Sequence, residues 1–190
     1  MIKNYIILHH SATWDDKTIK DFNAIKSGHL SIGDRDIGYH WLIEYAGGQI
    51  QVYQGRQESD SAAACPGKNF DAIHICLVGD FENEIPTSEQ YQTVANLCKD
   101  IMTRWPITEI CGHRDYYATA CPGANFNVDK VKEFIKEGEE YLTEVDIDVK
   151  GKILKGFIIN GISYVPVREF VESNNSAVLW DDVSKKVIIK

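Results

Sequence analysis

The chain lacks a basic run, a long apolar segment and a charged N-terminal leader. Of its 190 residues, 20 are Lys or Arg and 28 are Asp or Glu, so the formal net charge is −8. An acidic chain without clustered cations is a poor candidate for binding nucleic acid or an anionic membrane surface. No apolar run is long enough to span a bilayer, and no secretory leader precedes the first apolar segment. We therefore expect synthesis in the cytoplasm without a signal peptide, no nucleic-acid partner and no membrane insertion.

The cysteines cannot all pair, because there are five of them. A chain folded in a cytoplasm keeps its thiols reduced. The sequence therefore predicts that most of the thiols are small buried side chains and that one or more binds a metal. The five are Cys65, Cys76, Cys98, Cys111 and Cys121.

Apolar segments of strand type alternate with amphipathic segments of helical spacing through most of the chain. The expected strands cover residues 5–8, 37–43, 49–53, 73–79 and 107–111. The expected helices cover residues 16–27, with Gly28 as the stop, then 87–105, and a last one that Asn127 or Asp129 caps and that ends near residue 137. Thr87 with Gln90 three positions later predicts a capping box. This alternation predicts an α/β domain with a mixed central β-sheet flanked by helices.

The last quarter of the chain has a different character. Residues 1–143 carry 13 Lys and Arg against 21 Asp and Glu, whereas residues 144–190 carry 7 of each kind. The second segment predicts a small α+β module of two hairpins, one across Asn160-Gly161 and one over 178–189, with a short helix over 167–172 between them. A unit this small is close to the lower limit for folding alone. We expect it to dock on the first domain or to form a homodimer with a second copy.

Three residues suggest a metal site. His113 and Cys121 lie eight positions apart in a turn-rich segment that ends in Pro122-Gly123, and imidazole with thiolate suits zinc. His9, at the end of the apolar run 5–8, is the candidate for a third ligand, although taken alone it is better explained as a hydrogen-bonded core histidine. Three protein ligands leave one zinc position for water, whose pKa falls from ~15.7 to ~7. The set predicts a hydrolase for carbonyl or phosphoryl substrates.

Five segments in this order carry a family resemblance. They are His9-His10-Ser11-Ala12-Thr13, Ile37-Gly38-Tyr39-His40, Gly55-Arg56, Cys76-Leu77-Val78-Gly79 and residues 112–123. Together they resemble the zinc-dependent N-acetylmuramoyl-L-alanine amidases of the type-2 class, which include phage lysozyme-amidases and animal peptidoglycan recognition proteins. The resemblance covers roughly residues 3–137. It implies one zinc ion and cleavage of the amide between N-acetylmuramic acid and L-alanine in bacterial peptidoglycan.

The resemblance also implies roles for individual residues. By position, the zinc ligands fall on His9, His113 and Cys121, and the catalytic tyrosine falls on Tyr39. Thr119 occupies a position that is Lys in some members and Thr in others. Tyr39 and Thr119 would donate to the oxyanion that forms during hydrolysis, and an uncharged Thr119 is expected to stabilise it less than Lys would.

Substrate contacts are expected from four further residues. Arg56, Lys68 and Asn69 lie where relatives contact the muramyl-peptide, and His29 follows a helix and could rim the groove. For each, a scaffold role is the alternative. His74 alternates with Cys76 on a predicted strand and is expected to be buried.

Asp115, beside His113, could orient a zinc ligand, with a surface ion pair as the alternative. His10 and His40 are expected to be structural partners of the strand that carries His9.

Residues 146–190 carry a second, less specific resemblance, to the small repeat known from the N-terminus of copper amine oxidases and from secreted proteins of Gram-positive bacteria. It suggests a cell-wall-binding module that concentrates the enzyme on its substrate, with a spacer or dimerisation unit as the alternative.

The features together favour a phage or prophage endolysin that waits in the cytoplasm for holin-dependent release onto the wall. The alternatives are a cytoplasmic amidase that recycles muropeptides, a non-catalytic peptidoglycan receptor, and a structural zinc domain. Receptors of this family typically lack the thiolate ligand, and a structural zinc site needs a fourth ligand.

Overall fold

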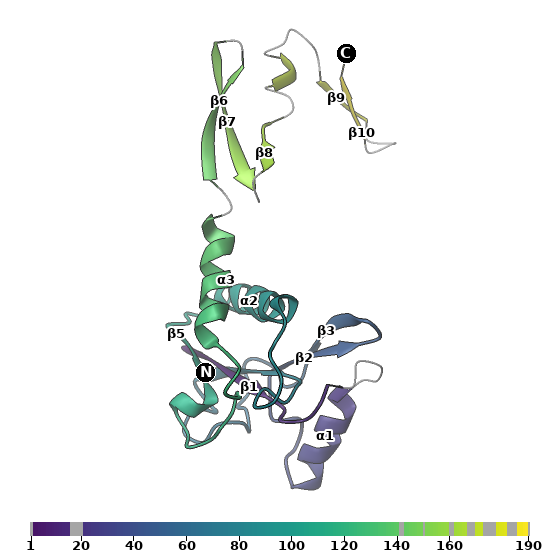
Figure 1. Cartoon of the computed structure of the whole chain (residues 1–190), viewed down its shortest axis with the longest axis vertical. Helices are drawn as coiled ribbons and strands as arrows, with labels where there is room; N and C mark the ends of the chain where they lie inside the picture. The colour runs from purple at the N-terminus through teal and green to yellow at the C-terminus, as the bar shows by residue number, and fades with distance from the viewer. Residues whose placement is uncertain are drawn as a thin grey trace. The chain divides into compact units, whose positions relative to one another are not determined.

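The computed structural model describes residues 2–15, 21–140, 143–149, 151–159, 162–166, 170–172, 178–181 and 186–189. The chain divides into two compact units, Met1–Ile135 and Lys136–Lys190, and its elements are labelled in Figure 1. None of the helices in the described part of the chain has the length and apolar character needed to cross a bilayer.

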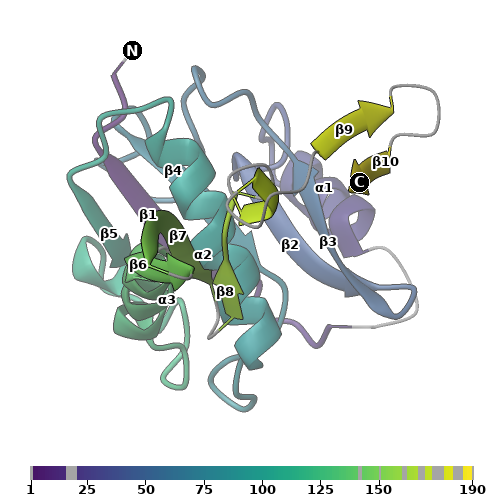
Figure 2. The ribbon, with the colours of Figure 1, turned by 90° about the horizontal axis from the view of Figure 1, so that it is seen from above.

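A five-stranded mixed sheet forms the centre of the first unit. Its strands are β1 (Tyr5–His10), β2 (Trp41–Ala46), β3 (Gln49–Gln54), β4 (Ala72–Leu77) and β5 (Glu109–Gly112). The order is β3-β2-β4-β1-β5, which can be followed across Figure 2. β1 is parallel to β4 and β5, β2 is parallel to β4, and β3 pairs with β2 as an antiparallel hairpin. The prediction of a mixed α/β sheet is confirmed.

Three helices accompany the sheet: α1 (Asp21–Ser31), α2 (Ser88–Met102) and α3 (Val128–Glu140). The capping box of α2 is confirmed, because Thr87 Oγ1 accepts from the Gln90 backbone N–H and Gln90 Oε1 accepts from that of Thr87. Of the two candidate caps for α3, Asn127 is the one used, since its side chain accepts from the backbone N–H groups of residues 129 and 130.

The predicted stop of the first helix was wrong. α1 continues through Gly28 to Ser31, and the chain turns at Gly33, which adopts φ +99°. A glycine can take this left-handed conformation without a Cβ clash, so Gly33 and not Gly28 ends the helical path. Residues 16–20, where the helix was expected to begin, lie outside the described residues.

The two faces of the sheet are buried differently. One face packs against α2 and α3 in a core that includes Ile6, Leu8 and Ile75, and α1 covers part of the other face through Phe22 and Ile25 (Figure 1). Because side chains alternate along a strand, His9 points away from the α2 and α3 core.

The second unit holds two sets of antiparallel strands. β6 (Thr143–Val149), β7 (Lys152–Ile159) and β8 (Ile162–Tyr164) form a three-stranded sheet, and β9 (Val178–Asp181) pairs with β10 (Lys186–Ile189). The β7–β8 and β9–β10 pairings match the two predicted hairpins. Residues 170–172 are helical; residues 160–161 and 167–169, also covered by predictions, lie outside the described residues.

Candidate metal centre

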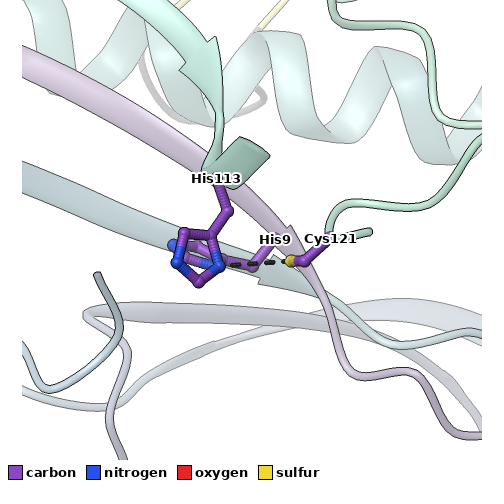
Figure 3. A group of neighbouring side chains, drawn as sticks. All are labelled: His9, His113 and Cys121. Atoms are coloured by element: carbon purple, nitrogen blue, oxygen red, sulfur yellow. Dashed lines mark hydrogen bonds between the residues drawn. The ribbon is translucent and has the colours of Figure 1, made fainter. Parts of the chain in front are cut away.

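Three side chains, one from the end of β1 and two from the loop after β5, converge at one edge of the sheet. His9 lies near the C-terminal end of β1, and His113 directly follows β5, the parallel neighbour of β1. Parallel strands end at the same sheet edge, so this topology brings the two imidazoles together. With Cys121 they offer ligand atoms that all lie within 4.8 Å of one another (Figure 3). The Cys121 Sγ is 3.6 Å from His9 Nδ1.

Backbone hydrogen bonds hold the Cys121 loop against the strand ends. The His10 N–H donates to Cys121 Sγ at 3.4 Å, and the Arg114 N–H donates to the Cys121 carbonyl at 2.9 Å. Thr119 Oγ1 accepts from the Cys121 N–H at 3.2 Å. Asp115 accepts from the backbone N–H of Gly112 at 2.8 Å and so stabilises the turn that carries His113.

A row of buried imidazoles continues behind His9. His9 Nε2 lies 2.9 Å from His74 Nδ1, and His74 Nε2 lies 3.2 Å from the Lys68 carbonyl. His40 Nδ1 accepts from the backbone N–H of His74 at 2.9 Å, and His40 Nε2 lies 3.2 Å from the Asp60 carbonyl. Burial lowers the pKa of His74 to about 3 and that of His40 to about 4, so both rings are neutral at pH 7.

The protonation states of the three candidate ligands follow from burial. Burial lowers the pKa of His9 well below its usual value, with His74 and His113 acting in the same direction, and burial also lowers the pKa of His113. Both imidazoles are therefore in the neutral form that binds metals. Burial raises the pKa of the Cys121 thiol to about 11, so this thiol keeps its proton until a cation favours the thiolate.

The donor set fits one zinc ion. His113 Nε2 is buried and has no hydrogen-bond partner among the described residues, an arrangement that costs free energy unless a ligand uses the nitrogen. Two imidazoles and one thiol are ligands that zinc prefers, and three protein ligands are the number found in catalytic sites. These residues could therefore hold zinc with one position open.

A cavity of about 360 Å³ opens beside the cluster. Its lining includes all five residues predicted as ligands or catalytic groups: His9, Tyr39, His113, Thr119 and Cys121. The ring centroid of Tyr39 is 5.2 Å from that of His9. Burial raises the pKa of Tyr39 well above its usual value, so its hydroxyl stays a hydrogen-bond donor at neutral pH.

Arg56 and Asn69, two of the predicted substrate contacts, are engaged with the chain's own backbone. The Arg56 guanidinium donates to the carbonyls of Ile37 at 2.7 Å and Ser61 at 2.9 Å. Asn69 Oδ1 accepts from the N–H groups of residues 64 and 65, both at 2.9 Å. These contacts support the scaffold alternative for both residues, and substrate contact stays a prediction.

Lys68 and His29 also have partners within the chain. Lys68 Nζ lies 3.2 Å from an Asp71 carboxylate oxygen and 3.6 Å from the centroid of the Tyr5 ring. His29 Nδ1 accepts from the Gly38 N–H at 2.6 Å, with its ring centroid 5.4 Å from that of Tyr39. His29 therefore stabilises the segment just before β2 that contains Tyr39. A substrate contact from Lys68 or His29 stays a prediction.

Two acidic residues of the cavity were not anticipated from the sequence. Asp80 and Glu82 line it beside the three candidate ligands. Both follow β4 at the sheet edge where His9 lies, so the strand-end rule that selected His9 would also have selected Asp80. The Glu82 carboxylate accepts from the Ala124 N–H at 2.7 Å, which ties this edge to the segment after Cys121.

Comparison with known proteins identifies the family. The family model for N-acetylmuramoyl-L-alanine amidases matches residues 2–124. The chain belongs to this family. The amidase LysC from Clostridium intestinale URNW superposes with a TM-score of 0.62 at 28% identity, covering 70% of this chain and 85% of that one.

Curated relatives of this amidase-family chain include recognition proteins and a phage enzyme. Peptidoglycan-recognition protein SC2 of Drosophila melanogaster is 32% identical over 130 residues, 64% of this chain and 69% of the relative. The endolysin of Enterobacteria phage T3 is 28% identical over 122 residues, 62% of this chain and 78% of the relative. The resemblance to N-acetylmuramoyl-L-alanine amidases is confirmed over residues 2–124. The second resemblance, of residues 146–190, lies outside this segment and stays a prediction.

Proposed function

We propose that the chain hydrolyses the amide bond between N-acetylmuramic acid and L-alanine in bacterial peptidoglycan. The observation that carries the proposal is the convergence of His9, His113 and Cys121 on a cavity, in a chain of the amidase family. A receptor that only binds peptidoglycan has no use for a zinc donor set with an open position. The presence of the Cys121 thiol therefore favours catalysis over recognition alone.

A zinc ion held by His9, His113 and Cys121 would supply Lewis acidity and lower the pKa of water to ~7. The chain's own side chains have separate tasks. Tyr39, kept protonated by its burial, donates a hydrogen bond to the carbonyl oxygen of the scissile amide as negative charge develops there. Thr119 donates from the opposite loop as a neutral hydroxyl, so Tyr39 provides most of this stabilisation from the protein.

The test is a digest of purified peptidoglycan by the full chain, with and without a chelator. The proposal predicts new L-alanine amino termini and no new reducing sugar ends. Release of these amino termini should stop when the chelator removes the metal and should return when zinc is added. New reducing ends would mean that a glycosidic bond is cut. Release that persists in chelator would remove the metal from the reaction.

Recognition without cleavage is the second candidate, because the similarity to peptidoglycan-recognition protein SC2 covers 64% of this chain. It predicts that the full chain sediments with peptidoglycan but releases no amino termini even with zinc present. A cytoplasmic recycling amidase predicts activity on soluble muropeptides and none on intact walls. The same preparation assayed on both substrates separates these outcomes.

We further propose that residues 1–143 form the amidase and that residues 144–190 bind the wall. The support is the resemblance of residues 146–190 to a repeat found in secreted proteins of Gram-positive bacteria. Sedimentation with purified walls should be stronger for the full chain than for a chain that ends at Glu140. Equal sedimentation contradicts wall binding, and a shift from dimer to monomer on truncation would assign the segment to dimerisation.

The similarity to a phage endolysin supports a cytoplasmic enzyme that reaches the wall after holin-dependent release. Expression in a bacterium with a sensitive wall should cause lysis only when a holin is co-expressed. Lysis without a holin contradicts this route.

A further inference from the structure

The side chain of His74 lies directly behind His9 on the neighbouring strand. In the parallel pairing of β1 with β4, Ile7 is opposite His74 and His9 is opposite Cys76. All four side chains therefore share the sheet face that points away from the α2 and α3 core. His74 is fully buried, and its two ring nitrogens each have one partner: His9 Nε2 at 2.9 Å and the Lys68 carbonyl at 3.2 Å.

The Lys68 carbonyl determines the direction of both hydrogen bonds. A carbonyl only accepts, so His74 Nε2 carries the proton and donates it. A neutral imidazole protonated at Nε2 has its lone pair on Nδ1, so His74 Nδ1 accepts from His9 Nε2–H. His9 then has its own lone pair on Nδ1, the atom that lies 3.6 Å from Cys121 Sγ. His9 therefore donates to His74, and His74 donates to the Lys68 carbonyl.

The environment of His74 keeps its ring neutral and fixed. The His74 ring contacts the His9 imidazole and the Lys68 carbonyl, and the His40 ring stacks on it with centroids 5.8 Å apart and planes 22° apart. His40 also accepts from the His74 backbone N–H. The strand position and the ring orientation of His74 are therefore both determined.

We propose that His74 is a positioning residue that accepts the Nε2 proton of His9 and so presents the His9 Nδ1 lone pair to the metal. The inference rests on the proposed metal site. Metal-binding histidines usually donate their second N–H to a carboxylate or a backbone carbonyl. Here a neutral imidazole relays that contact to the Lys68 carbonyl, so no second anion reduces the positive charge beside the Cys121 thiolate.

These two hydrogen bonds also link the loop before β4 to the candidate metal ligand His9. Lys68 and Asn69 were predicted as substrate contacts through their side chains, whereas the Lys68 backbone carbonyl acts on His9 through His74. A change in this loop therefore reaches the metal ligand through a single side chain.

The direct test is long-range ¹H–¹⁵N NMR of the imidazoles in the metal-free full chain. We expect His9 and His74 both to carry their proton on Nε2. A His9 protonated on Nδ1 overturns the proposal. This measurement uses the wild-type chain and no substrate, so its result is independent of whether any variant folds and of whether the chain cleaves peptidoglycan.

Zinc affinity, measured by competition with a chelating indicator, provides the second readout. His74→Leu removes the acceptor and should weaken zinc binding by about 10–100-fold, the usual cost of losing an outer partner of a ligand. His74→Asn, whose amide oxygen can accept from His9 Nε2–H, should recover most of the affinity. Ile73→Val, on the same strand with its side chain in the opposite core, is the matched control and should bind as the wild type does. Equal affinity in the Leu and Asn variants overturns the proposal.

Discussion

The metal centre and the neighbouring loop of residues 55–69 are both rich in polar side chains, yet they use them differently. In the loop, Arg56 and Asn69 are hydrogen-bonded to backbone groups of the same chain. In the centre, His113 leaves a buried nitrogen without a partner among the described residues, and Cys121 faces His9 across 3.6 Å. Satisfied groups stabilise a conformation, whereas a buried group without a partner costs free energy unless a ligand uses it. Residue type alone does not distinguish the two situations.

The largest effect is expected at the thiolate. Cys121→Ser replaces a ligand that zinc prefers with a hydroxyl that stays protonated at neutral pH. Release of L-alanine termini should fall by more than about 100-fold, because losing even an outer partner of a ligand costs about 10–100-fold. Cys98→Ala, a change in the core at α2 that does not line the cavity, is the control and should keep the activity per folded molecule. Full activity of Cys121→Ser would remove this residue from the centre.

A loss of stability is expected in the loop. Arg56→Met removes charge-assisted hydrogen bonds to the carbonyls of Ile37 and Ser61, each worth about 1.5–3 kcal/mol. We expect the free energy of unfolding in urea to fall by about 2–4 kcal/mol, with zinc affinity unchanged in the folded variant. Unaltered stability together with a raised KM would instead make Arg56 a substrate contact. The loop would then not be purely structural, in contrast to what its hydrogen bonds indicate.

A smaller effect is expected at Thr119. Its hydroxyl accepts from the Cys121 N–H and is the proposed second donor to the oxyanion. Thr119→Val should lower kcat by about tenfold, less than the loss of a dedicated oxyanion donor, with KM nearly unchanged. Thr119→Ser keeps the hydroxyl and is the matched control. If the Val variant has the wild-type kcat, the assignment of Thr119 as a donor is wrong.

Asp15 offers a contrast with the candidate centre, because its Oδ1 is also buried without a hydrogen-bond partner among the described residues. No metal donor set surrounds it among the described residues, so the unpaired atom is a cost to folding. Burial raises the pKa of Asp15 to about 6, above the unfolded value of about 3.9. The folded state therefore binds the proton more tightly, and stability falls as the pH rises from about 4 through 6.

Asp15→Asn should remove this decline. Its amide oxygen can still accept from the Tyr45 N–H, the contact that Asp15 Oδ2 makes at 3.1 Å. Urea unfolding at about pH 7 should show the Asn variant to be more stable than the wild type, with little difference near pH 4. Asp34→Asn is the control for a change of surface charge. A wild-type chain whose stability rises over the same pH interval contradicts the raised pKa.

Local signals in the sequence predicted the parts of the fold that depend on neighbouring residues. The Thr87 capping box and the core strands follow from short motifs and apolar runs. The end of α1 was missed because a glycine inside a helix and a glycine after it look alike until φ is known. The strand β6 was missed because its alternating acidic pattern acquires meaning only when it pairs along the whole of β7.

The residues of the candidate site also differ in how far a local sequence pattern could predict them. His113 and Cys121 share one loop, so their spacing was informative. His9 lies more than a hundred positions away, and only its place at the end of an apolar strand pointed to it before the family motif did. The relay through His74 was not anticipated, because it needs the register of β1 against β4 and the position of the Lys68 carbonyl. Hydrogen-bond partners of this kind arise from tertiary structure, which no local pattern contains.

The central claim is that one thiolate and two imidazoles hold a single zinc ion at the cavity. X-ray absorption spectroscopy of the zinc-loaded full chain tests it most directly. We predict one sulfur at about 2.3 Å and the remaining ligands as nitrogen or oxygen at about 2.0–2.1 Å, with the sulfur lost in Cys121→Ser and kept in Arg56→Met. A bound zinc with no sulfur, or with more than one, would contradict it.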